Sequence, residues 1–378
     1  MADPPVDEAH VAVEELSEDL DSAYGGDELK RASFTGSLSY SATNYKWEHG
    51  RRYQSFREGT YNFPNDEEEQ ERYDIMHAVF LTAMDDHLFL APLNQDLGRI
   101  LDIGTGTGIW AIQIGDMLPS AVVTGNDLSP IQPRWVPPNV TFEVDDVESE
   151  WQYSRPFDYV HSRYMAGSIA DWPRLMSQCY KPPYRCSATQ TDDGQLFFYS
   201  HLTPGGWVEF QDFDLHNYSQ DNSIPPDNKV LEWYNLLMEG CEKIGRTASP
   251  GQHLESWVRD AGFTNIHHKT FKLPLGAWPK DERMKRVGAL NLLQLLEGLE
   301  GLTLALFTRA LGWSTEAIHV YLAAVRKDAM KKSVHMIHDF LLMIMFAWEL
   351  SADCGRFSRW LSHVVYAQKP LTSSTPSE

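Results

Sequence analysis

The sequence predicts an α/β fold in which helices cover both faces of a parallel sheet and further helices form a cap. From Arg99 onward, strand patterns alternate with helix patterns, and this order is typical of a parallel sheet with right-handed crossovers. The stretch LDIGTGTGIW at 101–110 places three glycines directly after a strand. A helical block at 281–333 stands between the last two expected strands, so we expect it to lie above the sheet as part of the cap.

The chain before Arg99 contributes a tail and one helix. Residues 1–44 are acidic and have no sustained apolar period, which predicts a disordered tail, and 371–378 are expected to form a second one. The pair Asn65-Asp66 is expected to cap a helix whose first turn holds three glutamates. This helix places 45–92 in the cap. Its apolar face is predicted to contain Tyr73, Met76, Val79, Phe80 and Met84.

The elements after Arg99 follow in a regular order. The expected strands are RILDI, AVVTGNDL, VTFEVDD, FDYVHSRY and GGWVEFQDF, with helices in TGIWAIQIGDML and WPRLMSQCY. Later, HLESWVRDAGF is predicted to be a helix that ends at Gly262, and TNIHHKTFKL is predicted to be a strand. The chain is expected to return to strand in HVVYAQKP at 363–370.

Two segments interrupt this order, 182–200 and 341–362. Both are unpatterned, and long structureless loops are unusual inside a compact unit. They are either lid insertions or else translated introns or wrongly assigned gene segments, and we favour the latter interpretation because the flanking sequence joins naturally when each is removed. The sequence of the transcript distinguishes the two interpretations.

Composition excludes several classes of protein. The formal net charge of −21 argues against a nucleic-acid partner, because phosphate binding needs clustered Lys and Arg side chains. The four cysteines have neither zinc-site nor disulfide spacing. The N-terminal stretch has no signal-peptide pattern, and the apolar run at 341–348 is too short to cross a bilayer. We therefore expect an intracellular protein, cytoplasmic or nuclear, with no membrane partner.

The glycine turn is compatible with two ligands. Read from Gly106, the sequence matches the dinucleotide fingerprint GxGxxA, and read from Asp102 it is D-x-G-x-G-x-G, which suits S-adenosylmethionine. In both cases the glycines allow a tight turn and bring backbone N–H groups and a helix N-terminus close to the ligand. The glycines alone therefore do not decide between them.

Acidic residues at the ends of three successive strands favour S-adenosylmethionine. Asp102 lies where the first strand ends, and a carboxylate there suits a ligand with an ammonium and a sulfonium better than an anionic pyrophosphate. Asp127 ends the second strand and is placed to bind ribose hydroxyls, a feature that NAD-binding proteins share. Asp146, or less favourably Asp145, ends the third strand and is expected to accept from the adenine amino group, with Val147 as an apolar wall.

Five stretches together resemble the fungal LaeA-like methyltransferases, which are class I S-adenosylmethionine-dependent enzymes, many of them linked to secondary metabolism. The resemblance covers about Tyr45 to Pro370 without the two odd segments, so 45–370 is expected to be one methyltransferase domain. It implies a Rossmann-like seven-stranded, mostly parallel sheet with a reversed final hairpin. The stretches are EHGRRYQSFREGTYNFPNDEEEQERYDIMH, LDIGTGTGIWAIQIGD, NDLSPIQPRWVPPNVTFEVDDVE, FDYVHSRYMAGSIADWPRLM and LTPGGWVEFQDFD.

The resemblance also assigns cofactor contacts by position. Asp127 is assigned to the ribose and Asp146 to the adenine. The two insertions depart from the family pattern, at the fifth strand and at the closing strand. The residues assigned to the methionine end of the cofactor are Asp102, Gly104, Gly106 and Gly108.

Candidates for catalysis follow the fourth and fifth strands, where the ligand of such a sheet is expected. His161 is a candidate base, although an alternating strand equally allows a buried core histidine. Arg163 is a candidate for holding an anionic acceptor or the cofactor carboxylate, and Asp212 is a further catalytic candidate. Arg52 and Tyr53 are expected either to close over the cofactor or to pack against the cap.

Metal chemistry is not expected. In HMIHD at 335–339, two histidines three residues apart fit one helical face, but no third ligand is evident beyond Asp339, so a structural role is favoured. His267 and His268 are adjacent on a strand and point to opposite faces.

Three functions remain as hypotheses. The first is methyl transfer to a small-molecule acceptor, and the second is a regulator that binds S-adenosylmethionine and acts through protein partners. The third is an NAD-linked oxidoreductase, which ranks low because no Tyr-xxx-Lys or similar hydride-site pair is evident.

Overall fold

The computed structural model describes residues 44–57, 59, 61–94, 96–180 and 201–346. The predicted tails, apart from residue 44, lie outside the described residues, as do the segment 182–200 and the expected strand at 363–370.

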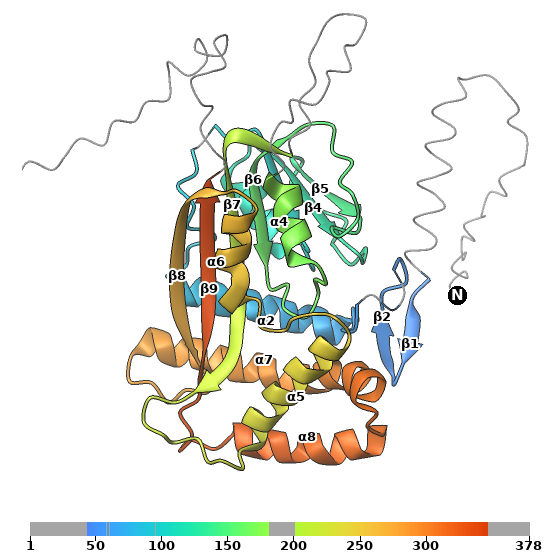
Figure 1. Ribbon diagram of the computed structural model, residues 1–378, viewed down its shortest axis with the longest axis vertical. Helices are drawn as coiled ribbons and strands as arrows, with labels where there is room; N and C mark the ends of the chain where they lie inside the picture. The colour runs from blue at the N-terminus through green and yellow to red at the C-terminus, as the bar shows by residue number, and fades with distance from the viewer. Residues whose placement is uncertain (1–43, 58, 60, 95, 181–200, 347–378) are drawn as a thin grey trace, which may run out of the picture. The chain divides into compact units, whose positions relative to one another are not determined.

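The centre of the fold is a seven-stranded sheet (Figure 1). The five neighbouring strands β5, β4, β3, β6 and β7 pair in parallel, and β9 pairs antiparallel with both β7 and β8. The predicted Rossmann-like, mostly parallel sheet with a reversed final hairpin is confirmed. In spatial order the strands are β5 (Val140–Val144), β4 (Val122–Asp127), β3 (Arg99–Ile103), β6 (Phe157–Arg163), β7 (Leu202–Tyr218), β9 (Ile337–Phe346) and β8 (Thr264–Pro274).

Helices cover both faces of the sheet. Helices α4 (Trp172–Tyr180) and α6 (Gly251–Asp260) pack on one face, and their buried Trp172 and Leu254 belong to one core cluster with the strand residue Phe210. Helix α3 (Ile109–Met117) packs on the opposite face, where Trp110 and Ile114 belong to a second cluster. From β3 the chain continues outward on one side to β4 and β5, and it then returns to the other side of β3 with β6. A crevice is expected at such a switch point, at the carboxyl ends of these strands.

Four helices form the predicted cap, and Figure 1 shows them together in the lower half of the view, around the end of β7. Helix α2 runs along α7, and α5 packs on α8. The helical block predicted at 281–333 is confirmed, whereas α5 was not expected from the sequence. The cap consists of α2 (Glu67–Ala83), α5 (Lys229–Lys243), α7 (Glu282–Leu306) and α8 (Thr315–Ala329), with a π-helical turn, η1 (Phe307–Leu311), after α7.

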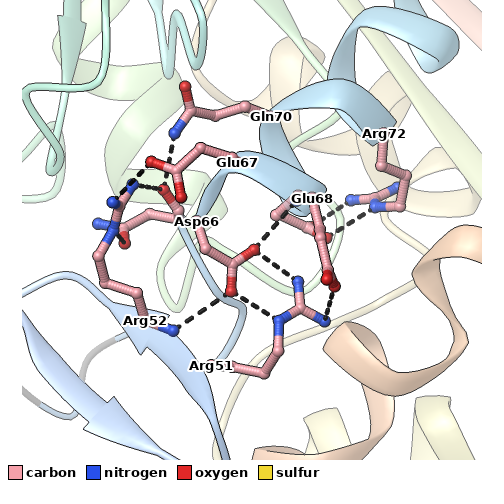
Figure 2. Close-up of polar contacts among 9 residues, drawn as sticks. Arg51, Arg52, Asp66, Glu67, Glu68, Gln70 and Arg72 are labelled. Atoms are coloured by element: carbon pink, nitrogen blue, oxygen red, sulfur yellow. Dashed lines mark hydrogen bonds and ion pairs between the residues drawn. The ribbon is translucent and has the colours of Figure 1, made fainter.

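A short N-terminal hairpin holds the start of α2. It consists of β1 (Lys46–Glu48) and β2 (Arg51–Tyr53), which the sequence patterns did not predict. The Arg51 guanidinium makes two hydrogen bonds to the Asp66 carboxylate, at 2.6 and 2.7 Å, and Asp66 accepts from the backbone N–H of Glu69 as the N-cap of α2 (Figure 2). The capping role predicted for Asp66 is therefore confirmed.

A buried ion pair lies one turn into α2. Arg72 donates from Nε and Nη2 to the two carboxylate oxygens of Glu69, at 3.0 and 2.6 Å, and both side chains are almost fully buried. The other terminal nitrogen, Nη1, donates to the hydroxyl of Tyr164 and to Oε1 of Gln294 on α7. This pair joins α2 to Tyr164, which follows β6, and to helix α7.

Strand β9 corrects one sequence prediction. We expected 341–362 to lie outside the fold, but the structure places 341–346 inside β9, between β7 and β8. The physical reason is that FLLMIMF at 340–346 is a continuous apolar run, and the strand is buried on both faces of the sheet, as in a central strand. The remainder, 347–362, lies outside the described residues, so its origin stays a hypothesis.

One helical stretch among the described residues, Glu282–Leu311, is long and apolar enough to cross a membrane by length and composition alone. Of its most apolar window, 67% is buried inside the protein. A buried core helix of a soluble protein has the same properties, so this stretch is weak evidence for a membrane span.

Candidate active site

The glycine turn connects β3 to α3 and exposes its backbone. Its three glycines have positive φ angles, 64° at Gly104, 57° at Gly106 and 80° at Gly108, which residues with a Cβ adopt only at a cost. A Cβ built on Gly108 would lie 2.4 Å from the Phe142 ring, whereas one on Gly106 would meet only Tyr73, at 3.8 Å. Gly106 therefore leaves open space beside its backbone.

A cleft of about 1100 Å³, including its open mouth, lies beside this turn. It brings together the acids predicted at the ends of three strands, with Asp102 from β3, Asp127 from β4, and Asp145 and Asp146 after β5. The other sequence-predicted residues on the cleft are Gly104, Gly106, Val147, His161 and Arg163.

Asp102 and His161 form a buried pair beneath the cleft. The Asp102 carboxylate accepts from Nδ1 of His161 at 2.7 Å and from the Thr105 hydroxyl at 2.6 Å. The His161 ring stacks on Trp110 with centroids 3.7 Å apart. Burial lowers the pKa of His161 to about 4, against the opposing effect of Asp102, so the ring is neutral at pH 7. This places His161 in the core position that the sequence left open, and its low pKa weakens the base role.

Asp127 links the second strand to the glycine turn. Its Oδ2 accepts from the backbone N–H of Gly106 at 2.9 Å, and its Oδ1 accepts from the backbone N–H of Ser129 at 2.9 Å. Each carboxylate oxygen has a further lone pair, so both remain able to accept from a ligand. Burial raises the pKa of Asp127 to about 6.

The residues after β5 form the far wall of the cleft. Asp146 accepts from the Ser149 hydroxyl and pairs with Arg57 at 3.2 Å. Asp145 accepts from the backbone N–H of Asp146, and burial raises its pKa. Val147 is buried beside them and supplies an apolar surface.

Comparisons with known proteins decide the family. A family model described as a methyltransferase domain matches residues 75–268. The chain is 47% identical over 309 residues to the methyltransferase pytC of Aspergillus terreus, which covers 82% of this chain and 90% of the relative. The chain belongs to this methyltransferase family. It is an S-adenosylmethionine-dependent methyltransferase, which agrees with the resemblance inferred from the sequence motifs.

Two further relatives of this methyltransferase have regulatory or protein-directed names. The secondary metabolism regulator LAE1 of Cochliobolus heterostrophus is 35% identical over 300 residues, which covers 78% of this chain and 91% of the relative. The protein-methionine methyltransferase laeA of Emericella nidulans is 35% identical over 293 residues, covering 76% of this chain and 72% of the relative. The methyltransferase thus has homologues in fungal secondary metabolism.

The structure places three predicted site residues, Arg163, Asp212 and Tyr53, in supporting positions. Arg163 lies on the cleft, but its Nε donates to Gln211 at 2.6 Å, its Nη2 donates to the carbonyl of Leu88, and its Nη1 lies 3.1 Å from Nδ1 of His77. These contacts direct the guanidinium into the protein. Burial also lowers the pKa of Arg163 to about 10.

Asp212 and Tyr53 are not among the described residues that line the cleft. The Asp212 carboxylate accepts from the backbone N–H groups of Met165, Ala166 and Phe213, so it holds the turn after β6. Tyr53 is buried in the N-terminal hairpin with the Arg309 guanidinium over its ring. We correct both assignments, because Asp212 lies within β7, which continues to Tyr218, and because the side chains of Asp212 and Tyr53 are both buried.

The sequence patterns missed several residues of the cleft. Trp110 and Thr105 flank the glycines and lie on the cleft, where they support His161 and Asp102. Tyr73 was expected only as part of an apolar helix face, yet its hydroxyl lies 2.9 Å from that of Tyr61 at the edge of the cleft. The one available signal was Trp110, an aromatic residue two positions after Gly108. Nothing in the sequence indicates that Tyr61 and Tyr73 lie together.

Binding of adenosylhomocysteine, the demethylated cofactor, is expected to depend on pH through Asp127. Because the pKa of this carboxyl is raised to about 6, it loses its charge as the pH falls below that value. Hydrogen bonds to a charged acceptor are stronger, so the affinity should fall about three- to tenfold between pH 7.5 and 5. Calorimetry across this range measures the effect. The Asp127→Asn variant should show a flat profile, and equal slopes in both proteins would contradict the assignment.

Proposed function

We propose that this methyltransferase transfers a methyl group to a small-molecule acceptor of fungal secondary metabolism. The observation that carries the proposal is the meeting of acids from three strand ends at one cleft beside an exposed glycine backbone. The relative with the highest identity among those described above, pytC, is named simply as a methyltransferase and is covered over 90% of its length.

The chain's own residues suit the donor. The open backbone at Gly106 lets a ligand approach closely, and Asp127 would hold the ribose hydroxyls. Asp145 or Asp146 would accept from the adenine amino group, with Val147 against the ring. Asp102 would face the ammonium group. When bound, S-adenosylmethionine supplies a methyl group that its positive sulfur has already activated.

Positioning and exclusion of water are the contributions that the cleft can make to the reaction. His77 and His161 lie on the cleft, and burial lowers their pKa values to about 3 and about 4. A histidine with so low a pKa does not retain a proton taken from the acceptor at neutral pH. We therefore propose that the acceptor reacts through a lone pair that is free at working pH.

An isotope experiment tests this function. The purified chain is incubated with S-adenosylmethionine carrying a labelled methyl group and with an extract of a fungal strain that lacks the protein. We expect label in the organic-soluble small molecules. The Asp127→Ala variant should weaken adenosylhomocysteine binding about tenfold or more in calorimetry, because the ribose hydrogen bonds are lost, and it should lower the labelling in parallel.

A regulatory function is the second candidate, because the chain is 35–37% identical to relatives named as secondary metabolism regulators. The same incubation separates the two. Label confined to the protein fraction would contradict transfer to a small molecule and favour a protein acceptor, such as the methionine named for the Emericella nidulans relative.

A further inference from the structure

A second cavity lies next to the cleft, beneath the cap. The empty space that it encloses is about 630 Å³, including the part that is open to solvent, as for the cleft. Four residues, Tyr61, Tyr73, Tyr164 and Ser168, line both cavities. The two hydroxyls of Tyr61 and Tyr73 lie 2.9 Å apart, so this hydrogen-bonded pair stands where the cavities meet.

The wall of the second cavity combines aromatic and aliphatic side chains, and it comes from both the sheet and the cap. Phe213 projects from β7, and Trp233 and Tyr234 project from α5. The indole N–H of Trp233 is already used by the Thr303 hydroxyl, at 2.8 Å, so this residue offers its ring rather than its polar atom. Flat apolar rings are well accommodated by such a wall, because aromatic faces pack closely on one another.

The electrostatics of the second cavity favour an uncharged occupant. Arg72 is the charged side chain among its described lining residues, and Glu69 neutralises it through two hydrogen bonds. Its other terminal nitrogen is held by Tyr164 and Gln294. An anion or a cation placed here would lose its hydration without gaining a free countercharge, which is costly.

One polar atom in this wall has no partner. His338 from β9 is 2% exposed, and its Nδ1 makes no hydrogen bond in the described part of the structure. Burial lowers the pKa of His338 to about 4, so the ring is neutral. A buried polar atom without a partner costs free energy, which a ligand with a hydroxyl or carbonyl group would recover. His338 belongs to the HMIHD motif, in which His335 instead pairs with Asp221 at 2.6 Å.

We propose that the second cavity is the acceptor site and that it takes a neutral, aromatic small molecule bearing a hydroxyl or carbonyl group toward His338. This inference rests on the proposed function, since it names the acceptor class for the same enzyme. A charged acceptor is disfavoured by the neutralised Arg72, and an aliphatic acceptor without a polar group would leave Nδ1 of His338 without a partner and would not stack on Phe213 and Trp233.

A matched series of probes tests the charge preference without turnover. The full chain is saturated with adenosylhomocysteine, and binding of 2-naphthol, 2-naphthoate and 2-naphthylmethylammonium is measured by ligand-observed NMR. We expect 2-naphthol to bind and the two ions to bind about tenfold more weakly or not at all. Stronger binding of either ion, or complete displacement of 2-naphthol by adenosylhomocysteine, would overturn the assignment.

Two variants locate the probe. Ala248→Leu adds volume at a cavity wall that is 4% exposed, and it should weaken 2-naphthol binding about tenfold. His338→Phe keeps the ring shape but removes both nitrogens, and it should weaken binding severalfold. Ala323→Leu on the exposed face of α8 is the matched control and should change nothing. Unfolding curves verify that each variant is folded. If Ala248→Leu does not fold, the binding of 2-naphthol to His338→Phe tests the cavity assignment.

The outcomes separate this inference from the proposed function. If both variants bind 2-naphthol as the wild type does, the cavity assignment is wrong. If the wild-type chain binds no adenosylhomocysteine, the proposed function fails and the acceptor role fails with it. If adenosylhomocysteine binds but 2-naphthol does not, the acceptor assignment alone is overturned.

Discussion

Replacing Arg72 with leucine is expected to lower the free energy of unfolding by about 3–5 kcal/mol. The substitution leaves the Glu69 carboxylate buried without its countercharge, and its side chain is only 1% exposed. The Tyr164 hydroxyl and Gln294 lose a donor at the same time. Chemical denaturation measured on the purified variant gives the change directly.

Two further variants show that the effect comes from the unpaired charge. The double variant Glu69→Leu/Arg72→Leu removes both charges and should be more stable than Arg72→Leu alone, because two apolar side chains need no hydration. Arg259→Leu breaks the exposed pair with Glu255, at positions i and i+4 of α6, and should cost less than about 1 kcal/mol. Equal losses at Arg72 and Arg259 would show that burial of the first pair has no energetic consequence.

Gly108→Ala is expected to destabilise the fold by about 2–5 kcal/mol. One part is the φ angle of 80°, which costs an alanine about 1–2 kcal/mol. The other is overpacking, about 1–3 kcal/mol, because the new Cβ would lie 2.4 Å from the Phe142 ring. The midpoint of chemical denaturation should fall accordingly.

Gly106→Ala is the matched comparison within the same turn. Its φ of 57° carries a similar backbone cost, but the nearest atom to the new Cβ, on Tyr73, is 3.8 Å away. We expect this variant to remain folded with a smaller loss and to bind adenosylhomocysteine more weakly, since the methyl group enters the cleft. A Gly106→Ala variant as unstable as Gly108→Ala would show that crowding at Phe142 is unimportant.

Elements with a strong local pattern were predictable from the sequence. RILDI and WPRLMSQCY match β3 and α4 residue for residue, because each combines a clear apolar period with a defined start or stop. Helix α5 has a clear N-cap in Asn228 but follows a polar stretch that gives no warning of it. The hairpin β1–β2 has three-residue strands, which are too short to show a period.

The acids of the cleft were predictable for a topological reason. Parallel strands that leave the sheet at one edge bring their following residues together, so Asp102, Asp127 and Asp146 needed only correct strand ends. Side-chain direction could not be predicted in the same way. Arg163 ends β6, and Asp212 lies within β7, which extends further than its sequence pattern predicted. Their partners, Gln211 and the Met165 backbone, hold both side chains inside the protein.

The second cavity was not predictable, because its wall combines residues that are distant in the sequence. Tyr73, Trp233 and His338 come from α2, α5 and β9, and each has an ordinary local pattern for a buried residue. HMIHD was interpreted as two histidines on one helical face, whereas His338 in fact lies in a strand.

The position of β9 in the sheet has a consequence for synthesis on the ribosome. Strand β8, which ends at Pro274, reaches the sheet only through β9, which begins at Ile337. Until those later residues have emerged, the nascent chain exposes two unpaired strand edges, one on β7 and one on β8, and such edges are prone to associate with other chains. The sheet is therefore completed late in synthesis, and we expect a chain that is released before β9 is made to bind chaperones.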